Sequence, residues 1–364
     1  MEPIRTARFV MRPLRLDDAP TLATYRSDPS TAAMQSWSVP YPVERAAQMI
    51  ATMIAMKGPE DGAWYALGIA DPLTDELLGD VVARLEWNGR AAEVGFTLAP
   101  GARGLGAATE GATAMVELLF ESLGVQRIHA AIHPENFPSA MVLERLGFTY
   151  EGTHRQAYWV GDECTDDVIF GLLRSDWEHW RARPRHRPTV VRLIDVDYEN
   201  CEAVAALATH WSQRRFVSPM ARWFTNLLDT GVDDHGGPYI PWFQAVIADD
   251  ELVGAVVLLD STPTHPTPYL WRLLIDRHHQ RRSVGTGVLD LITARCCRRG
   301  DRALRVQYGQ GRGNPSALYL GYGFEPTGRL VGGEVEALLP LTTGESAGAG
   351  VDQSLASIQG DTST

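Results

Sequence analysis

Two short segments, 177 residues apart, have the composition of phosphate-binding loops. The first is Arg103-Gly104-Leu105-Gly106-Ala107-Ala108 and the second is Gln280-Arg281-Arg282-Ser283-Val284-Gly285. Each follows an apolar segment and precedes a helical pattern, which places it at a helix N-terminus. Unpaired backbone N–H groups and the helix dipole favour an anion there, and small residues let a phosphate approach the backbone closely. The chain is therefore predicted to hold two anion-binding sites.

The elements that must position these loops recur in the same order in both halves. Each half is predicted to have an opening strand, helices, a hairpin, the strand before the loop, the helix after it, a further strand and a short helix that ends in Gly-Phe. The paired segments are Phe9 to Leu14 and Val190 to Ile194, Asp71 to Asp75 and Asp249 to Glu251, Ile128 to Ile132 and Ala303 to Gln307, and Gly147-Phe148 and Gly323-Phe324. This alternation predicts an internal repeat in which a mixed sheet carries helices on both faces.

Composition limits the class of protein. A chain of 364 residues is comfortable for two domains. The formal charge of −12 argues against a nucleic-acid partner. The sequence has no apolar run long enough to predict a membrane span. Its N-terminus lacks the apolar core of a secretory signal. We therefore expect a cytoplasmic protein with free cysteines.

With these elements in place, the loops resemble the (Q/R)-x-x-G-x-(G/A) loop with which GNAT-type N-acetyltransferases bind acetyl-CoA. The first loop fits in full at Arg103, Gly106 and Ala108, whereas the second has Gln280 and Gly285 but Ser283 at the first glycine. The chain is thus similar to two GNAT-type domains in tandem. The resemblance implies an α+β (mixed α/β) fold, each twisted sheet opening into a splayed cleft, and implies acetyl-CoA (CoA) as the cofactor.

The two halves resemble different subgroups. The first is similar to the ribosomal-protein-alanine acetyltransferases, and the second to the diamine/polyamine acetyltransferases. The carrying segments are residues 103–110, 142–148 and 172–177 with Asn136 and Ser139, and residues 213–217, 269–276, 314–317, 321–324 and 333–334. In one departure, the stretch from Asn314 to Phe324 is two residues shorter than the stretch from Asn136 to Phe148, so we expect an altered helix in the second half.

These patterns predict four regions along the chain. Residues 1–180 and 189–342 are expected to form the two GNAT-type domains. The basic, proline-containing stretch 181–188 is expected to be a linker, and residues 343–364 a disordered tail.

The resemblance also assigns the cofactor's pantetheine arm to the strand before each loop. Those residues are Phe96, Thr97 and Leu98 in the first half, and Leu273, Leu274 and Ile275 in the second. A backbone N–H of the same strand would stabilise the tetrahedral oxyanion. Asn136 and Asn314 are expected to bond the pantetheine arm, to cap the following helix, or both.

The reaction requires a neutral amine, so a group must accept its proton. Glu93 stands in the strand before the first loop as a candidate base, or as a solvated acid at a strand edge. Glu110, in the helix after the loop, more plausibly satisfies the helix dipole. In the second half Leu270 aligns with Glu93, which leaves Glu334 as the candidate base or as a surface turn residue.

The leaving thiolate should receive a proton. Ser139 matches the hydroxyl implied for this role by the first subgroup, although helix capping explains it equally. Tyr319 matches a tyrosine of many superfamily members, or it packs under the following strand. We expect no metal site, because adjacent His278 and His279 cannot chelate one ion well.

The leading hypothesis is an acetyl-CoA-dependent N-acetyltransferase that acts on a primary amine, either a protein N-terminus or a small-molecule or polyamine amine. The first half is the better candidate for turnover. One alternative is a catalytic domain fused to a degenerate regulatory or dimerisation domain, and another is acetylation of an antibiotic amine. A homodimer is compatible with either. The acidic run Asp229 to Asp234, if it lined the second cleft, would attract a polycation.

Overall fold

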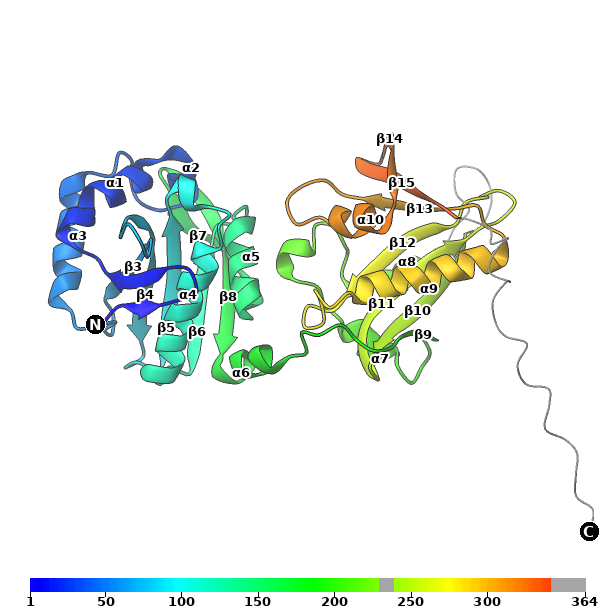
Figure 1. Cartoon of the computed structure of the whole chain (residues 1–364), viewed down its shortest axis with the longest axis horizontal. Helices are drawn as coiled ribbons and strands as arrows, with labels where there is room; N and C mark the ends of the chain where they lie inside the picture. Colours follow the sequence, from blue (N-terminus) through cyan, green and yellow to red (C-terminus); the bar gives the residue numbers. More distant parts are fainter. Residues whose placement is uncertain (229–238, 342–364) are drawn as a thin grey trace, which may run out of the picture. The chain divides into compact units, whose positions relative to one another are not determined.

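The computed structural model describes residues 1–228 and 239–341, which divide into two compact units. The first unit contains residues 1–184 and His210–Ser212, and the second contains residues 185–209 and those from Gln213 onward. Each unit is a mixed sheet with helices, so the expected α+β fold is confirmed (Figure 1). The predicted tail and the acidic run Asp229 to Asp234 lie outside the described residues.

The described residues of the first unit form an eight-stranded sheet in the order β1-β2-β3-β4-β5-β6-β8-β7. The strands are β1 (Ile4–Arg5), β2 (Val10–Pro13), β3 (Trp64–Ala70), β4 (Leu77–Glu86), β5 (Ala91–Leu98), β6 (Arg127–Ile132), β7 (Thr149–Val160) and β8 (Glu163–Leu173). Neighbouring strands run antiparallel except β5 and β6, which run parallel.

Helices of the first unit pack on both faces of this sheet. They are η1 (Leu16–Asp18), α1 (Ala19–Ser27), α2 (Pro29–Ala32), α3 (Val43–Ala55), η2 (Pro100–Ala102), α4 (Ala107–Glu117), η3 (Leu118–Ser122), α5 (Phe137–Leu146) and α6 (Arg174–Ala182). One core gathers Met115 of α4 and Leu143 of α5 against the sheet, and a second gathers Leu22 of α1 and Ile50 of α3. Because alternate residues of β4 and β5 face opposite cores, each strand presents one face to α4 and α5 and the other to α1 and α3.

The second unit repeats this plan. Its described sheet has the order β14-β15-β13-β12-β11-β10-β9, and again one neighbouring pair, β12 and β13, runs parallel. The strands are β9 (Val191–Asp195), β10 (Ile240–Ala248), β11 (Glu251–Asp260), β12 (Tyr269–Ile275), β13 (Ala303–Tyr308), β14 (Glu325–Val331) and β15 (Glu334–Pro340), and the helices are α7 (Cys201–Ala206), α8 (Met220–Leu228), α9 (Val284–Arg299) and α10 (Ser316–Tyr322). The predicted repeat is therefore present as a repeated strand order.

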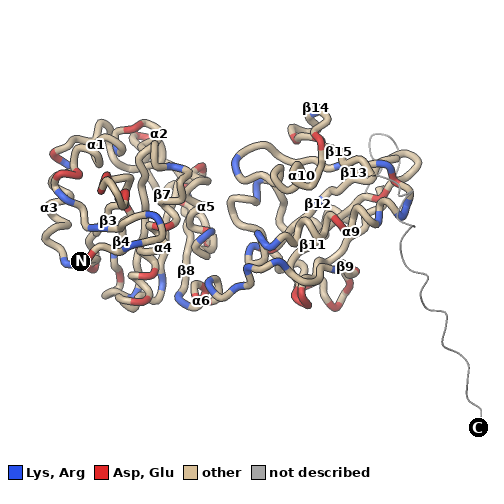
Figure 2. The backbone as a smooth tube through the Cα atoms, in the orientation of Figure 1, with Lys and Arg blue, Asp and Glu red and all other residues tan. Residues whose placement is uncertain are grey.

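The ends of two helices can be compared with the expectations from the sequence. Helix α6 continues to Ala182, into the stretch expected to be a linker from residue 181. Helix α10 has 7 residues whereas α5 has 10, so the shorter sequence in the second half does shorten this helix. Acidic and basic residues are interspersed along both units (Figure 2).

Three residues from beyond the linker, His210–Ser212, complete the first unit and begin the short helix η4 (Trp211–Gln213). The Trp211 ring stacks on Phe137 at the start of α5, with the ring centroids 5.4 Å apart. The backbone N and hydroxyl of Ser212 donate to the carboxylate of Glu144 at 2.8 and 2.7 Å. These contacts hold the outer side of α5, the helix that borders the cleft described below.

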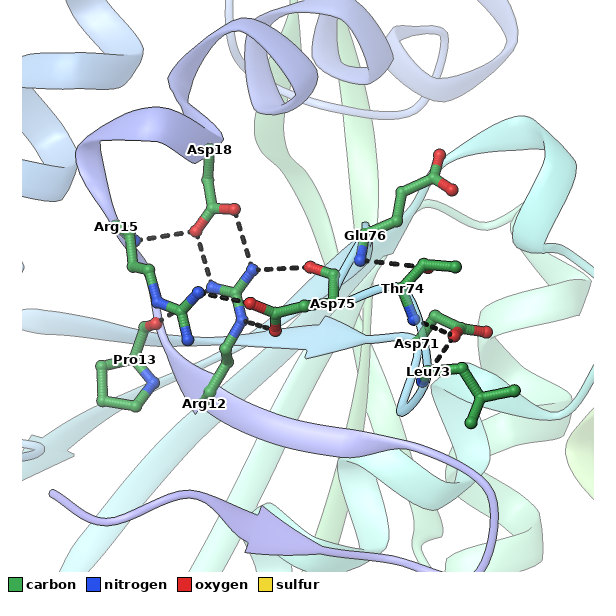
Figure 3. A network of polar contacts seen from close by, with 9 residues as sticks. All are labelled: Arg12, Pro13, Arg15, Asp18, Asp71, Leu73, Thr74, Asp75 and Glu76. Carbon is green, nitrogen blue, oxygen red and sulfur yellow. Dashed lines mark hydrogen bonds and ion pairs between the residues drawn. The ribbon is translucent and has the colours of Figure 1, made fainter.

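A buried ion-pair network holds the start of the first unit to the β3–β4 turn (Figure 3). The Arg12 guanidinium donates to both carboxylate oxygens of Asp18, at 2.8 and 3.0 Å, and its Nε donates to Asp75 at 2.7 Å. The backbone N of Arg15 also donates to Asp18, and the Arg15 side chain pairs with Asp75. Because Arg12 is 3% exposed, this bidentate pairing compensates the burial of its charge.

None of the helices in the described ranges, 1–228 and 239–341, combines the length and apolar character needed to cross a bilayer.

Replacing Asp18 with alanine should destabilise the protein by about 3 kcal/mol, because it leaves the buried Arg12 cation without its main partner. The free energy of unfolding in a denaturant titration measures this loss. Arg15→Ala is the matched control, because the Arg15 side chain is exposed, and it should cost less than about 1 kcal/mol. Equal effects of the two substitutions would contradict this account of the network.

Candidate active sites

In both units the parallel strand pair separates immediately after it forms. Strand β5 pairs with β6 only from Ala91 to Glu93, and β12 pairs with β13 only at Tyr269 and Leu270. Beyond these points, the backbone of residues 94–98 and 271–275 faces a widening gap and has no pairing strand on that side. An extended, peptide-like ligand can hydrogen-bond to such an edge as an added strand.

The first predicted loop lies at the N-terminus of α4. Gly104 and Gly106 both have positive φ, 81° and 85°, and Gly106 is the N-cap residue. No side chain caps this helix, so its first N–H groups remain directed at the solvent side of the loop. Arg103 donates to the hydroxyls of Ser30 and Thr31, at 2.8 and 2.5 Å, which anchors the start of the loop.

The second loop keeps this backbone conformation without the glycines. Arg281 and Ser283 have φ values of 64° and 60°, at the positions that Gly104 and Gly106 occupy in the first loop. Ser283 is the N-cap of α9 and makes no side-chain cap. Both loops therefore present an uncapped helix N-terminus beside a splayed strand edge, which fits a diphosphate followed by an extended arm.

The gap in the first unit opens into a cavity of about 750 Å³. Its wall includes Phe96 and Thr97 on β5 and Asn136 and Ser139 at α5. The cavity is also lined by carboxylates and aromatic rings: Asp80, Glu93, Asp167, Trp37, Tyr41, Trp64 and Tyr158. One cavity is thus lined by three predicted cofactor residues, Phe96, Thr97 and Asn136, and by two predicted catalytic residues, Glu93 and Ser139. Leu98 and residues 103–108 do not line it.

Glu93 is held by a neighbouring cation. Its carboxylate accepts from the Arg84 guanidinium at 2.5 Å, and Arg84 also pairs with Glu86 at 3.0 Å. Glu86 in turn contacts the His129 ring at 3.0 Å. The ligand atoms of Glu86, Glu93 and His129 lie close enough together to surround a metal ion, but the cation placed among the two carboxylates is Arg84.

Asp167 on β8 is a second carboxylate near Glu93, and it was not among the residues predicted from the sequence. Within the described residues, no hydrogen bond or ion pair engages its side chain. Burial, followed by repulsion from Glu93, raises the pKa of Asp167, while His133 and His154 oppose the shift. Asp166 is bonded to the backbone N of Gln156, so the two consecutive carboxylates have different roles. A pair of acids directly before the apolar run of this strand was the signal that could have identified this residue.

The start of α5 resolves the capping question. Asn136 is the N-cap residue, and its side-chain oxygen accepts from the backbone N of Ser139 at 3.2 Å. The Ser139 hydroxyl is not the cap, and among the described residues it makes no hydrogen bond. It is therefore available to a ligand in the cavity.

Glu110 is engaged outside the cavity. It accepts from Arg8 Nε at 2.5 Å, from the Arg8 backbone at 3.1 Å and from the Thr6 hydroxyl at 2.9 Å. This arrangement agrees with a carboxylate that stabilises the first turn of α4 and ties down the N-terminal strand, rather than with a catalytic acid.

The second unit has its own cavity, of about 400 Å³. The predicted cofactor residues that line it are Leu273, Ile275, Gln280, Arg281, Ser283, Val284, Gly285 and Asn314, together with Tyr319. Leu274 faces the opposite core, and Arg282 is buried and donates to the backbone of His186. Asn314 accepts from the backbone N and hydroxyl of Ser316, at 3.3 and 2.6 Å, and so supports the start of α10.

Tyr319 and Glu334 lie near each other, together with Tyr269. The negative charge of Glu334 adds to burial in raising the pKa of both tyrosines. Tyr319 belongs to the core, where it stacks on Tyr308 with 5.8 Å between ring centroids, and it also borders the cavity. The raised pKa keeps the Tyr319 hydroxyl protonated.

A β-bulge corrects the alignment of Leu270 with Glu93. In the first unit Glu93 pairs with Arg84 on β4 in an unbroken register. In the second unit Arg272 pairs with Val257 and Leu270 with Leu258, which leaves Trp271 as an extra residue. When paired positions are counted from the end of the strand next to the loop, Tyr269 occupies the position of Glu93. The counterpart of Glu93 is therefore Tyr269 and not Leu270.

A mixed sheet with one splayed parallel pair, next to an uncapped helix N-terminus, defines a protein that binds a coenzyme's diphosphate and its extended arm. Family models agree: an acetyltransferase (GNAT) domain matches residues 8–149, and the acetyltransferase (GNAT) family matches residues 202–322. The chain belongs to the GNAT family of N-acetyltransferases, whose domains use acetyl-CoA. The predicted tandem arrangement of two such domains is confirmed.

Individual relatives cover about half of the chain or less. The uncharacterized N-acetyltransferase p20 of Bacillus licheniformis is 30% identical over 179 residues, which are 49% of this chain and 99% of the relative. The [ribosomal protein uS5]-alanine N-acetyltransferase of Escherichia coli is 27% identical over 122 residues, 32% of this chain and 62% of that protein. A solved ribosomal-protein-S5-alanine acetyltransferase from Vibrio fischeri is 20% identical, with a TM-score of 0.44 over 49% of this chain and 99% of that one.

Replacing Gly106 with glutamate should remove acetyl-CoA binding by the first unit. The substitution adds a carboxylate beside the diphosphate and a side chain at a φ of 85°, so affinity should fall on the order of 100-fold or more. Calorimetry should then count one bound CoA per chain instead of two.

The matched control for this experiment is Ser283→Gly, which fits the left-handed backbone of the second loop and should leave both sites. A stoichiometry of two in the Gly106→Glu variant would rule out the first loop as a diphosphate site.

Proposed function

We propose that this protein transfers the acetyl group of acetyl-CoA to a primary amine, with the first unit as the principal catalyst. The observation that carries the proposal is the cavity of the first unit. It brings a free strand edge and the Ser139 hydroxyl together with two carboxylates, Glu93 and Asp167. The free strand edge suits the thioester, and the carboxylates suit a cationic amine.

Acetyl-CoA would bind with its diphosphate at residues 103–108 and its pantetheine arm along Phe96 and Thr97. The thioester carbonyl then lies at the strand edge, where a backbone N–H can stabilise the oxyanion. For the second unit, the corresponding assignments are residues 280–285 and the strand Leu273 to Ile275.

The acceptor amine must lose a proton before or during its attack. A protein α-amine has an ordinary pKa of about 7.7–8.0 and an alkyl amine one of about 10. We assign proton acceptance to Asp167, because its carboxylate has no cation bound to it in the described structure and its raised pKa makes it a better base. Glu93, neutralised by Arg84, would help to position the ammonium form of the acceptor.

The remaining steps follow from the geometry of α5. The amine nitrogen bonds to the acetyl carbonyl carbon, and the C–S bond then breaks to release CoA as a thiolate. Ser139 is the proposed proton donor to this sulfur, since its hydroxyl lines the cavity and does not cap the helix. In the second unit Tyr319 is proposed for this step and Glu334 as the base.

The acceptor itself is proposed as a class. The acidic, aromatic lining favours an amine that arrives as a cation. The name of the Escherichia coli relative, which specifies an alanine of a ribosomal protein, supports a protein α-amine. The cavity volume is equally suited to a small-molecule amine, including an antibiotic amine.

The test is a purified full-length chain incubated with acetyl-CoA and a panel of amines and ribosomal proteins. Thiol release is followed by absorbance, and products are identified by mass. Release that depends on an amine, and on an intact Gly106 loop, would support the proposal. Absence of amine-dependent release across the panel, with CoA bound, would overturn it.

Asp167→Asn should reduce kcat/KM of the first unit at least about 100-fold, because the amide cannot accept a proton. In the unmodified protein, burial and Glu93 raise the pKa of Asp167, so kcat/KM should fall as pH decreases through that raised value and the carboxylate becomes protonated. A pH profile of thiol release measures this limb, which the Asn variant should lack.

The control for this profile is Asp166→Asn, which alters the neighbouring carboxylate but leaves Asp167 in place. It should preserve the limb. An acidic limb that survives in Asp167→Asn would assign proton acceptance to another group, with Glu93, His133 and His154 as the nearby titratable side chains.

A further inference from the structure

The second cleft contains an arginine where the first has no side chain. Strand pairing places Arg272 at the position of Gly95, because both stand three residues before the strand end at Ile275 or Leu98. Arg272 lines the cavity of the second unit beside Trp271, on the strand edge assigned to acetyl-CoA. The acceptor side of this cleft therefore differs from that of the first unit in charge as well as in size.

The partners of Arg272 are neutral. Its Nη1 donates to the Ser218 hydroxyl at 2.5 Å, and its Nη2 donates at 2.9 Å to the Asn226 amide, turned with the oxygen towards the guanidinium. Its Nε is buried without a hydrogen-bond partner. The guanidinium also lies over the rings of Trp271 and Trp223, at 4.6 and 5.7 Å from their centroids.

No carboxylate in the described residues forms an ion pair with this cation. Glu334 and Tyr269 lie within electrostatic reach, and Arg222 adds a like charge from α8. Burial is the main influence on Arg272 and lowers the pKa of the guanidinium. A half-buried cation without an anionic partner is costly, and an anion that enters the cavity removes this cost.

We propose that the second unit acetylates an acceptor that carries a carboxylate as well as an amine, and that Arg272 binds this carboxylate. An arginine has five N–H donors in a planar fork that matches a carboxylate, and the hydrogen bonds to Ser218 and Asn226 leave one N–H on each terminal nitrogen in addition to the buried Nε. The acceptor class is thus an amino acid or a related amino carboxylate, in contrast to the cationic amine proposed for the first unit.

The reaction is an ordinary acyl transfer. The amino group bonds to the acetyl carbonyl carbon, the C–S bond of acetyl-CoA breaks, the amine proton passes to a base such as Glu334, and the thiolate takes a proton. The product is an N-acetyl amino acid with its carboxylate still on Arg272. This inference rests on the proposed function, because it requires the second unit to bind acetyl-CoA.

The test uses the full-length chain with Gly106→Glu, which silences the first unit. Thiol release is compared for matched pairs that differ only in the carboxylate, such as lysine and cadaverine, or phenylalanine and phenethylamine. The kcat/KM of the amino acid should be on the order of 100-fold higher than that of the amine, because an amine without the carboxylate leaves the Arg272 cation without an anionic partner. Binding of the N-acetyl amino acid and of its decarboxylated analogue, with CoA present, is measured by calorimetry.

Arg272→Gln should abolish the preference mainly through KM, and Arg272→Lys should restore part of it. Arg222→Gln is the matched control, because Arg222 is an exposed arginine nearby, and it should keep the preference. If Arg272→Gln instead lowered kcat equally for an amino acid and for its decarboxylated analogue, Arg272 would act on the oxyanion and not on the carboxylate. That result would overturn the proposal.

Three other outcomes also overturn it: equal rates for both members of a pair, a preference that survives in Arg272→Gln, and neither turnover nor binding of N-acetyl amino acids. The unmodified chain distinguishes this failure from failure of the proposed function. If the first unit still releases thiol with other amines, the acetyltransferase assignment stands and only the role of Arg272 is lost.

Discussion

Both clefts depend on a parallel strand pairing that stops early. In each unit two or three residues of one strand are bonded to the next, and the strands then diverge. The divergence frees the backbone groups of residues 94–98 and 271–275, and an extended ligand can satisfy them. It also leaves room for the helix that follows the loop to direct its N-terminus at a phosphate. Every site residue discussed above is placed by reference to this opening.

Given the same opening, the two units differ in the charge around it. The first surrounds the gap with Asp80, Glu93 and Asp167, and neutralises part of this charge with Arg26 of α1 and Arg84 of β4. The second places Arg272 there instead, a cation that forms no ion pair with any carboxylate of residues 1–228 and 239–341. The two units thus have cofactor sites of the same kind, but the charges beside these sites are opposite in sign. Such a difference is expected if two transferases with different substrates are fused in one chain.

The loops, the helices after them and the order of elements along each half could be predicted from the sequence, since each depends on local patterns that recur at a fixed offset. The capping role of Asn136 was among the predicted alternatives for the same reason. The bulge at Trp271 could not be predicted, because one extra residue in a strand changes the pairing partner without changing the apolar pattern. Asp167 was not predicted because its position beside Glu93 of β5 is a tertiary contact, and Glu93 is distant from it in the sequence.

The left-handed backbone at Arg281 and Ser283 costs roughly 1 kcal/mol or more per residue relative to glycine, yet the loop retains its shape. The strand before it and the helix after it must therefore impose the conformation. A gene copy can consequently drift away from its family's glycine signature while the protein retains the coenzyme cradle. Surveys that recognise such domains by the glycine signature alone will record one GNAT domain where the chain contains two.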